Sequence, residues 1–271
     1  MAQSQMKTLL VDHSAGMLTI TLNRPEVRNA MSLDMVGELT DVLGSAQADP
    51  SVRVVVVRGS GGHFCAGGDI GDMAQARMKM AAGDPDAMAA VNAKFGRLCL
   101  AYARSPLPII SVLEGSVMGG GFGLACVSDV TLALNNVVFR LPETSLGVVP
   151  AQIAPFLVER IGYAEAKRLA VTGGKVGAAE ALAIRLVHEV HADAESLNAA
   201  VKQVADRMTA CAPGAIATTK KLLARARLEA PQDLIEDAAQ LFSQAIQSAE
   251  GQEGTAAFMQ KRQPSWVPQE S

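Results

Sequence analysis

Two glycine-rich segments, each following a strand-like run, contain residue types suited to holding a reacting oxygen. In the first, Val54–Arg58 leads through Gly59–Gly62 to the sequence FCAGGDI at 64–70. In the second, Ile109–Leu113 leads to Gly119–Gly121. Small residues after a strand let a ligand approach the backbone N–H groups, and two such groups directed at one oxygen form an oxyanion hole. Each segment alone is more typical of a tight turn, so the chemical interpretation requires both.

Several motifs that would indicate another chemistry are incomplete. The sequence GGGFG at 119–123 lacks a dinucleotide fingerprint, because the positions that need a final glycine hold Leu124 and Cys126. The sequence GGK at 173–175 lacks the upstream glycine and the following Ser or Thr of a phosphate-binding loop. HEVH at 188–191 is not the HExxH of zinc proteases, and the chain contains no GxSxG of a serine hydrolase.

The segments that must position these glycines alternate between strand and helix patterns. Residues 9–24 alternate apolar and polar around Gly16, which predicts a β-hairpin. Ser32 is a predicted N-cap, and the helix after it has apolar residues at helical spacing: Leu33, Val36, Leu39 and Leu43. Three apolar runs are predicted as buried strands: Val52–Arg58, Ile109–Leu113 and Val127–Leu134. This alternation predicts the α/β class.

Helical patterns dominate the remainder of the chain. Residues 72–104 form a stretch rich in Met and Ala that is interrupted at 83–85. We interpret its methionines as core residues, although methionine also suits the lining of an apolar pocket. The C-terminal third is mostly helical and includes a long amphipathic run at 230–250. We therefore expect an α/β core over 1–190 and a helical C-terminal region over 191–271.

Composition narrows the class of protein further. The chain has 271 residues, 24 Lys+Arg against 27 Asp+Glu, a net charge of −3, and 49% apolar residues. Such a chain can bury its own core and has no long-range attraction to nucleic acid. Its four cysteines show no CxxC pairing, which argues against zinc and disulfides. The N-terminus lacks the apolar core of a signal peptide, and the apolar stretch 109–134 is interrupted, so we expect a soluble, cytoplasmic, metal-free protein.

Four ordered motifs together resemble the crotonase (enoyl-CoA hydratase/isomerase) superfamily. They are Asn23-Arg24-Pro25 with Asn29-Ala30, the segment 64–70, the glycines 119–121, and Leu141-Pro142-Glu143 with Leu146-Gly147. The order and spacing match over nearly the whole chain, as far as Phe258 and Lys261. The resemblance implies a crotonase-like α/β spiral of ββα units. It also implies a helical C-terminal region that builds homotrimers, often paired into hexamers as dimers of trimers.

The same resemblance implies an acyl-CoA thioester as substrate, with coenzyme A as part of the substrate and no permanently bound cofactor. Two backbone N–H groups, which map to Ala66 and Gly120, would hold the thioester carbonyl oxygen and stabilise an enolate. The residues that would contact coenzyme A are Val27, Arg28, Ala30, Gly67, Gly68, Asp69, Phe258 and Lys261, the last two often from a neighbouring subunit. For Asp69, a helix N-cap is an equally good interpretation.

The acid–base residues depart from the family pattern. Hydratases of the family carry two glutamates, of which the second maps to Glu143 and the first falls at Gly123, which has no side chain. One carboxyl group with a raised pKa can still move a proton between carbons, as in the family's Δ3,Δ2-enoyl-CoA isomerases. It can also serve water addition if Glu143 handles both the water and its proton. Glu114 is a candidate replacement, although a turn residue that is exposed or paired with N–H groups is the favoured interpretation.

Within the family, LEG at 113–115, GGGFG at 119–123 and FCAGGDI at 64–70 are most similar to the subgroup that hydrates isohexenylglutaconyl-CoA, a branched isoprenoid thioester of terpene breakdown. We therefore predict a lyase that adds water to a 2-enoyl-CoA. The alternative is an isomerase that uses Glu143 as its single proton shuttle. An RNA-binding relative is disfavoured by the net charge of −3 and the lack of a Lys/Arg stripe.

Overall fold

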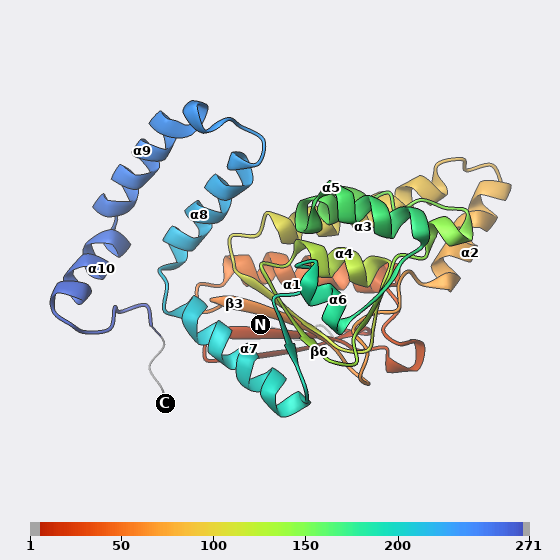
Figure 1. Ribbon diagram of the computed structural model, residues 1–271, viewed down its shortest axis with the longest axis horizontal. Helices are drawn as coiled ribbons and strands as arrows, with labels where there is room; N and C mark the ends of the chain where they lie inside the picture. The colour runs from red at the N-terminus through yellow and green to blue at the C-terminus, as the bar shows by residue number, and fades with distance from the viewer. Residues whose placement is uncertain (1–5, 268–271) are drawn as a thin grey trace.

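The computed structural model describes residues 6–267 and has a mixed α/β core with a helical C-terminal region (Figure 1). Residues 1–5 begin the stretch examined for a signal peptide, and residues 268–271 end the predicted C-terminal region; both lie outside the described residues. A six-stranded sheet has the order β1-β2-β3-β4-β6-β9, and a three-stranded sheet has the order β5-β7-β8. The α/β prediction is confirmed.

The large sheet begins with the predicted hairpin and continues with parallel neighbours. In the small sheet β5 and β7 are parallel, and β8 is antiparallel to β7. The strands are β1 Leu9–Ser14, β2 Met17–Leu22, β3 Val54–Gly59, β4 Ile109–Leu113, β5 Ser116–Met118, β6 Val130–Leu134, β7 Val138–Arg140, β8 Lys175–Gly177 and β9 Glu189–His191. The strand predicted at Val127–Leu134 is too long, because Val127 is the last residue of a helix.

Helices cover both faces of the large sheet. They are α1 Leu33–Ala48, α2 Ile70–Ala81, α3 Ala87–Ala103, α4 Gly120–Val127, α5 Ala154–Thr172, α6 Ala178–Ala183 and α7 Ala194–Thr209, followed by α8 Pro213–Ala226, α9 Pro231–Gln247 and α10 Ala249–Met259. The four valines Val54–Val57 of β3 alternate between the faces. The first and third pack against α7, and the other two join the larger cluster under α1, α3, α4 and α5. Burial on both faces explains the continuous apolar run.

Local signals predicted the helix boundaries well. The Oγ of Ser32 accepts a hydrogen bond from the N–H of Met35 at 3.2 Å, so the predicted N-cap of α1 is confirmed. The helical stretch 72–104 divides into α2 and α3 on either side of residues 82–86, as the interruption at 83–85 predicts. Both signals depend on residues close in sequence, which is why they are readable without the fold.

The methionines of α2 and α3 do not belong to the core. Met73, Met78 and Met80 are exposed, and Met88 is only half-buried. Ala76 is the buried residue of α2. The interpretation of these methionines as core residues is therefore wrong, and three of them lie at the surface of a helix that begins beside the glycine-rich segment.

Helices α8, α9 and α10 extend from the core as a C-terminal arm (Figure 1). The predicted boundary at 190/191 falls inside β9, and α7 still packs on the sheet, so the arm begins at Pro213. Its exposed large apolar residues are Leu223, Leu228, Ile235, Phe242, Ile246, Phe258 and Met259. Within residues 6–267, no helix combines the length and the apolar character that crossing a membrane needs.

Candidate active site

Glu143 and the glycines 119–121 meet because β5 and β7 are parallel neighbours. Met118 at the end of β5 is paired with Arg140 at the end of β7. The carboxyl ends of parallel strands lie at the same edge of a sheet, so the loops that follow them are brought together. A Cβ atom at Gly119 would lie 3.5 Å from Oε1 of Glu143. Two motifs separated in sequence thus form one site.

The segment 64–69 lies against the same loops, fixed by backbone hydrogen bonds on both sides. On one side the N–H of Cys65 donates to the carbonyl oxygen of Ser116 at 2.9 Å. On the other side the N–H of Met31 donates to the carbonyl oxygen of Gly67 at 2.7 Å, and the N–H of Asp69 donates to that of Met31 at 3.0 Å. These bonds hold the backbone between Cys65 and Asp69 in one orientation.

The N–H of Gly68 is directed away from Met31, because the neighbouring carbonyl of Gly67 and N–H of Asp69 both face Met31. Among the described residues it has no hydrogen-bond acceptor. Its nitrogen lies 3.8 Å from the position of a Cβ atom at Gly119. The Gly68 N–H therefore faces the loop between β5 and α4.

The N–H of Gly120 is the second unpaired donor at this point. Gly120 is the first residue of α4, where helical geometry provides no acceptor, and the part of the chain that the structure describes supplies none either. Gly119 before it has φ +46° and ψ −115°, and a Cβ atom there would lie 3.3 Å from Cα of Gly67. Both the conformation and the close approach require glycine. The helix dipole of α4 adds positive potential at the Gly120 N–H.

The predicted donor Ala66 is already engaged. Its N–H donates to the carbonyl oxygen of Arg28 at 2.9 Å, on the side of the segment away from the β5 loop. Gly67, at φ +108°, turns the backbone between Ala66 and Gly68, so the two N–H groups face opposite sides. The structure therefore argues against Ala66 as an oxyanion donor and offers Gly68, which the sequence predicted only as a coenzyme A contact.

Glu143 is the first residue of a short 3₁₀ turn, Glu143–Leu146, and is half-buried. Its Oε2 atom is buried and has no hydrogen-bond partner among residues 6–267. Burial raises the pKa of Glu143 above its ordinary value of 4.5. A carboxyl group in this state is suited to accepting a proton and giving it back.

We expect Glu143→Gln to raise the melting temperature near pH 8 and to have little effect near pH 4. Because the folded-state pKa of Glu143 is raised, the folded protein binds this proton more tightly than the unfolded chain. Stability is therefore lost as the pH rises from the ordinary value through the folded-state value. Glutamine stays neutral and avoids that loss. Thermal unfolding of both proteins at pH 4 and pH 8 measures the difference in stability, because a chain of this size changes its melting temperature by about 2–4 °C per kcal/mol. Equal changes in melting temperature at the two pH values would indicate a packing effect instead.

The other predicted carboxylates take structural positions. Glu114, directly after β4, forms an ion pair with the guanidinium of Arg58 at 3.6 Å, so its carboxylate already has a charged partner. Asp69 is the N-cap of α2, and its Oδ1 accepts hydrogen bonds from the N–H groups of Gly71 and Asp72 at 2.8 and 3.2 Å. The N-cap interpretation of Asp69 is confirmed.

Asp69→Ala is expected to lower the free energy of unfolding by about 1–2 kcal/mol through loss of the cap. Asp69 also pairs with Arg24, at 2.7 Å, and Asp69→Asn removes that pair while keeping a good capping residue. Urea unfolding of the two variants separates the cap from the ion pair. An unchanged stability with a raised KM for an acyl-CoA would instead make Asp69 a ligand contact.

Apolar side chains surround the site. The Sδ atom of Met73 lies 3.7 Å from the position of a Cβ atom at Gly68, and the ring of Phe95 lies 3.3 Å from that of a Cβ atom at Gly120. Neither residue was predicted for the site, and only the methionine content of 72–104 gave a signal. Exposed apolar residues also follow two of the site residues in sequence: Ile70 after Asp69, and Leu146, Val148 and Val149 after Glu143.

The predicted coenzyme A residues outside the segment 64–69 fall into two groups. The first, Val27, Arg28 and Ala30, lies beside the segment 64–69, where Arg28 accepts the Ala66 N–H. Arg24 connects the two segments, because its Nη1 donates to the carbonyl oxygen of Ala30 and to Asp69. The second group, Phe258 and Lys261, lies at the end of α10 on the C-terminal arm, at the far end of the molecule from α2 in Figure 1. Phe258 is 85% exposed.

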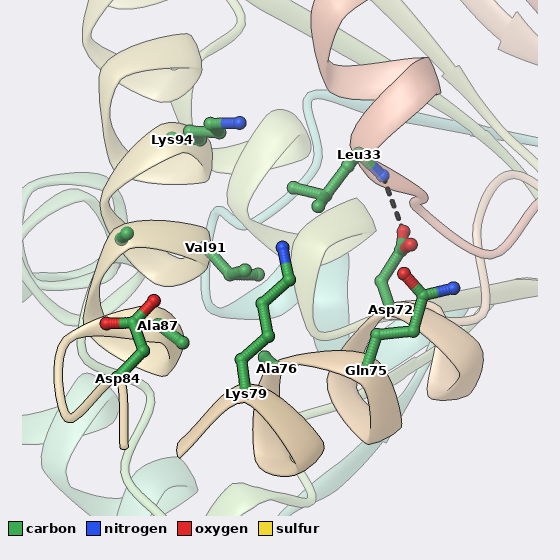
Figure 2. Close-up of a pocket in the computed structure, with 10 residues that line it drawn as sticks. Leu33, Asp72, Gln75, Ala76, Lys79, Asp84, Ala87, Val91 and Lys94 are labelled. Carbon is green, nitrogen blue, oxygen red and sulfur yellow. Dashed lines mark hydrogen bonds between the residues drawn. The ribbon is translucent and has the colours of Figure 1, made fainter. Parts of the chain in front are cut away.

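A cavity of about 160 Å³ lies elsewhere, between the start of α1 and helices α2 and α3. Figure 2 shows Lys79 directed into it near Leu33 and Val91, and Asp72 accepting a hydrogen bond from the N–H of Leu33 at 2.6 Å. Its lining contains neither Glu143 nor the two glycines with unpaired N–H groups, so it is separate from the candidate site. No group of His, Cys, Asp or Glu in the described chain is arranged to hold a metal ion.

Comparison with known proteins decides the family. The family model described as enoyl-CoA hydratase/isomerase matches residues 12–269. The chain belongs to this family. As a member of the enoyl-CoA hydratase/isomerase family it is an enzyme of the crotonase superfamily, and the resemblance drawn from the four sequence motifs is confirmed.

Three relatives of this enoyl-CoA hydratase/isomerase family member match over 96% of its length. The 2,3-dehydroadipyl-CoA hydratase of Escherichia coli is 30% identical over 262 residues, which cover 96% of this chain and 99% of that protein. An enoyl-CoA hydratase/isomerase from Marinobacter aquaeolei has 48% identity and a TM-score of 0.92, with 96% and 99% of the chains covered. AtuE of Pseudomonas aeruginosa has 50% identity and a TM-score of 0.92, with 96% and 100% covered. The crotonase fold prediction is therefore confirmed.

Proposed function

We propose that this protein is a hydratase that adds water across the double bond of a 2-enoyl-CoA. The observation that carries the proposal is the pair of N–H groups of Gly68 and Gly120, which have no acceptor among residues 6–267, beside Glu143, whose buried Oε2 has no partner in the same range. The thioester carbonyl oxygen accepts hydrogen bonds from both N–H groups, in place of the pair Ala66 and Gly120 expected from the sequence. The hydratase name of the Escherichia coli relative supports water addition over isomerisation.

In the proposed reaction the carboxylate of Glu143 takes a proton from water as the water oxygen bonds to C3. The electron pair of the C2=C3 bond moves toward the carbonyl oxygen, and the resulting enolate is stabilised by the two N–H groups. The carboxylic acid of Glu143 then donates its proton to C2. The product is a 3-hydroxyacyl-CoA. The raised pKa of Glu143 suits these two steps, because its carboxyl group must hold the proton between them.

The remaining contacts and the assembly belong to the same proposal. Coenzyme A lies along the two adjacent segments 27–30 and 67–69, with Val27, Arg28, Ala30, Gly67 and Asp69 as its contacts. Phe258 and Lys261 reach it from a neighbouring subunit of a homotrimer or of a hexamer made from two trimers. The exposed apolar side chains of the C-terminal arm support such an assembly, because they need a covering surface. In this proposal the core carries the site, and the C-terminal arm builds the assembly.

A branched acyl group of the isohexenylglutaconyl type is the proposed substrate class. Its support is the apolar surface beside the site, where Met73 borders Gly68 and the exposed residues Leu146 and Val149 follow Glu143. Methionine side chains adapt to irregular apolar groups. The alternative function, a Δ3,Δ2-enoyl-CoA isomerase, draws its support from Gly123, which leaves Glu143 as the single proton carrier.

A product screen in 18O-labelled water tests the proposed function. Crotonyl-CoA, a 3-enoyl-CoA and 3-methylglutaconyl-CoA are offered to the purified protein, and the products are analysed by mass spectrometry. Uptake of one labelled oxygen per product is the expected result. A shifted double bond without label would assign the isomerase instead, and no product from any thioester would overturn both.

A further inference from the structure

The ring of Phe95, on α3, faces two glycines that are one turn apart on α4. A Cβ atom at Gly120 would lie 3.3 Å from Cε2 of this ring, and a Cβ atom at Gly123 would lie 2.9 Å from Cζ and 3.1 Å from Cε1. Side chains in proteins do not pack this closely, so any residue larger than glycine at 123 has to displace the ring. The glycines of α4 thus provide the space that Phe95 fills.

Helix α3 is held in this position from a second side. Gly96, next to Phe95, allows the side chain of Gln152 to approach the helix, and Nε2 of Gln152 donates to Oδ1 of Asn92 at 2.8 Å. Gln152 belongs to the loop that follows the 3₁₀ turn of Glu143. Helix α3 therefore contacts both chain segments that supply the site: α4 with Gly120 through Phe95, and the loop after Glu143 through Asn92 and Gly96.

The position of the ring places it beside the reacting part of a bound thioester. The nitrogen and the Cβ position of one residue are both attached to its Cα, so the ring lies within about 6 Å of the Gly120 nitrogen. A carbonyl oxygen bound to that N–H lies about 2.9 Å from the nitrogen. The first carbons of an acyl chain that leaves this carbonyl on the α3 side therefore meet the ring. Phe95 is half-buried, so part of it remains accessible for such a contact.

We propose that Phe95 determines the acyl specificity of this enzyme by forming the wall beside C2 of the bound enoyl group. This proposal rests on the proposed binding of the thioester carbonyl at Gly68 and Gly120. The ring has no hydrogen-bonding group, so it excludes bulk at C2 by contact alone. A pocket wall of this kind discriminates by roughly 10- to 200-fold for one methyl-sized group.

The test compares crotonyl-CoA with tiglyl-CoA, which carries an additional methyl group at C2. Phe95→Ala is expected to raise the ratio of kcat/KM for tiglyl-CoA over crotonyl-CoA by about tenfold or more, with the Kd of free coenzyme A unchanged. Phe156→Ala is the matched control. Phe156, on α5, is also half-buried against the same core cluster, so its truncation should reduce stability and leave the ratio unchanged. An unchanged ratio in folded Phe95→Ala would overturn the proposal.

A second pair of variants tests the packing that the proposal requires. Gly123→Ala should destabilise the wild-type protein, and this loss should shrink in the Phe95→Ala background, because the ring is what the new methyl group meets. Equal losses in both backgrounds would contradict the placement of the ring. If Phe95→Ala fails to fold, the ratio of kcat/KM for tiglyl-CoA over crotonyl-CoA is measured in Phe95→Leu instead.

Binding measurements separate this proposal from the proposed function. The Kd values of both thioesters are measured by calorimetry in the Glu143→Gln background, with and without Phe95→Ala. A tenfold shift in their ratio without any turnover by the wild-type protein would support the Phe95 wall and contradict the hydratase function. Hydration by the wild-type protein with no shift in the ratio would contradict only the wall.

Discussion

Glu143→Gln is expected to lower kcat for enoyl-CoA hydration by about a thousandfold or more, while the Kd of the thioester stays within about twofold. The carboxyl group both takes the proton from water and returns it to C2, and acid–base groups of this kind contribute roughly 10²- to 10⁴-fold each. Glutamine has nearly the same shape but carries no transferable proton. Steady-state kinetics and calorimetric binding of crotonyl-CoA to the same preparation measure the two quantities.

Glu114→Gln is the matched control, because Glu114 follows β4 of the large sheet and pairs with Arg58. It should retain kcat within about twofold. A comparable loss in Glu114→Gln would mean that Glu114 supplies the second carboxylate after all. Loss of thioester binding in Glu143→Gln, with kcat retained at saturation, would make Glu143 a structural residue.

The parts of the fold that were predictable depend on neighbours in sequence. The hairpin around Gly16, the cap at Ser32 and the break between α2 and α3 all follow from residues within one turn or one loop. The residues Glu143 and Gly120, which the structure brings together, were named from the sequence because their motifs resemble the family. Their convergence follows from β5 and β7 being adjacent and parallel.

Which of the two candidate N–H groups, Ala66 or Gly68, lacks an acceptor was not predictable from the sequence. Ala66 and Gly68 are two residues apart and would face the same side of a regular strand. The positive φ of Gly67 reverses that relation, and the pairing with Arg28 and Met31 uses one N–H and leaves the other free. A glycine between two candidate donors is a signal that alternation is interrupted, but only the tertiary pairing shows which donor remains.

Contacts between helices were equally beyond sequence reasoning. Phe95 has no motif of its own, and its position follows from Gly120 and Gly123 of α4, which leave room for its ring. The methionines of α2 were assigned to the core from composition, yet α2 packs through Ala76 and leaves them at the surface. In each case the face that a helix presents is set by its partner, which composition does not identify.

Gly120→Pro is expected to lower kcat by about a hundredfold or more, because it removes the N–H that stabilises the enolate oxygen. Proline is tolerated at the first position of a helix, and Gly120 occupies that position in α4, so the variant should fold. Its added carbon atoms approach the ring of Phe95, and this steric effect has to be separated from the loss of the donor. Circular dichroism verifies the fold before the kinetics are compared.

Gly120→Ala makes that separation, since alanine adds a Cβ atom 3.3 Å from the ring but keeps the N–H. The ratio of kcat between the alanine and proline variants therefore reports the hydrogen bond itself, and we expect it to exceed about thirtyfold. Because the enolate carries more charge on the oxygen than the bound substrate does, the loss should fall on kcat rather than on the Kd of the thioester. Equal kcat values in the two folded variants would exclude Gly120 as an oxyanion donor, leaving the Gly68 N–H as the single backbone contact to the reacting oxygen.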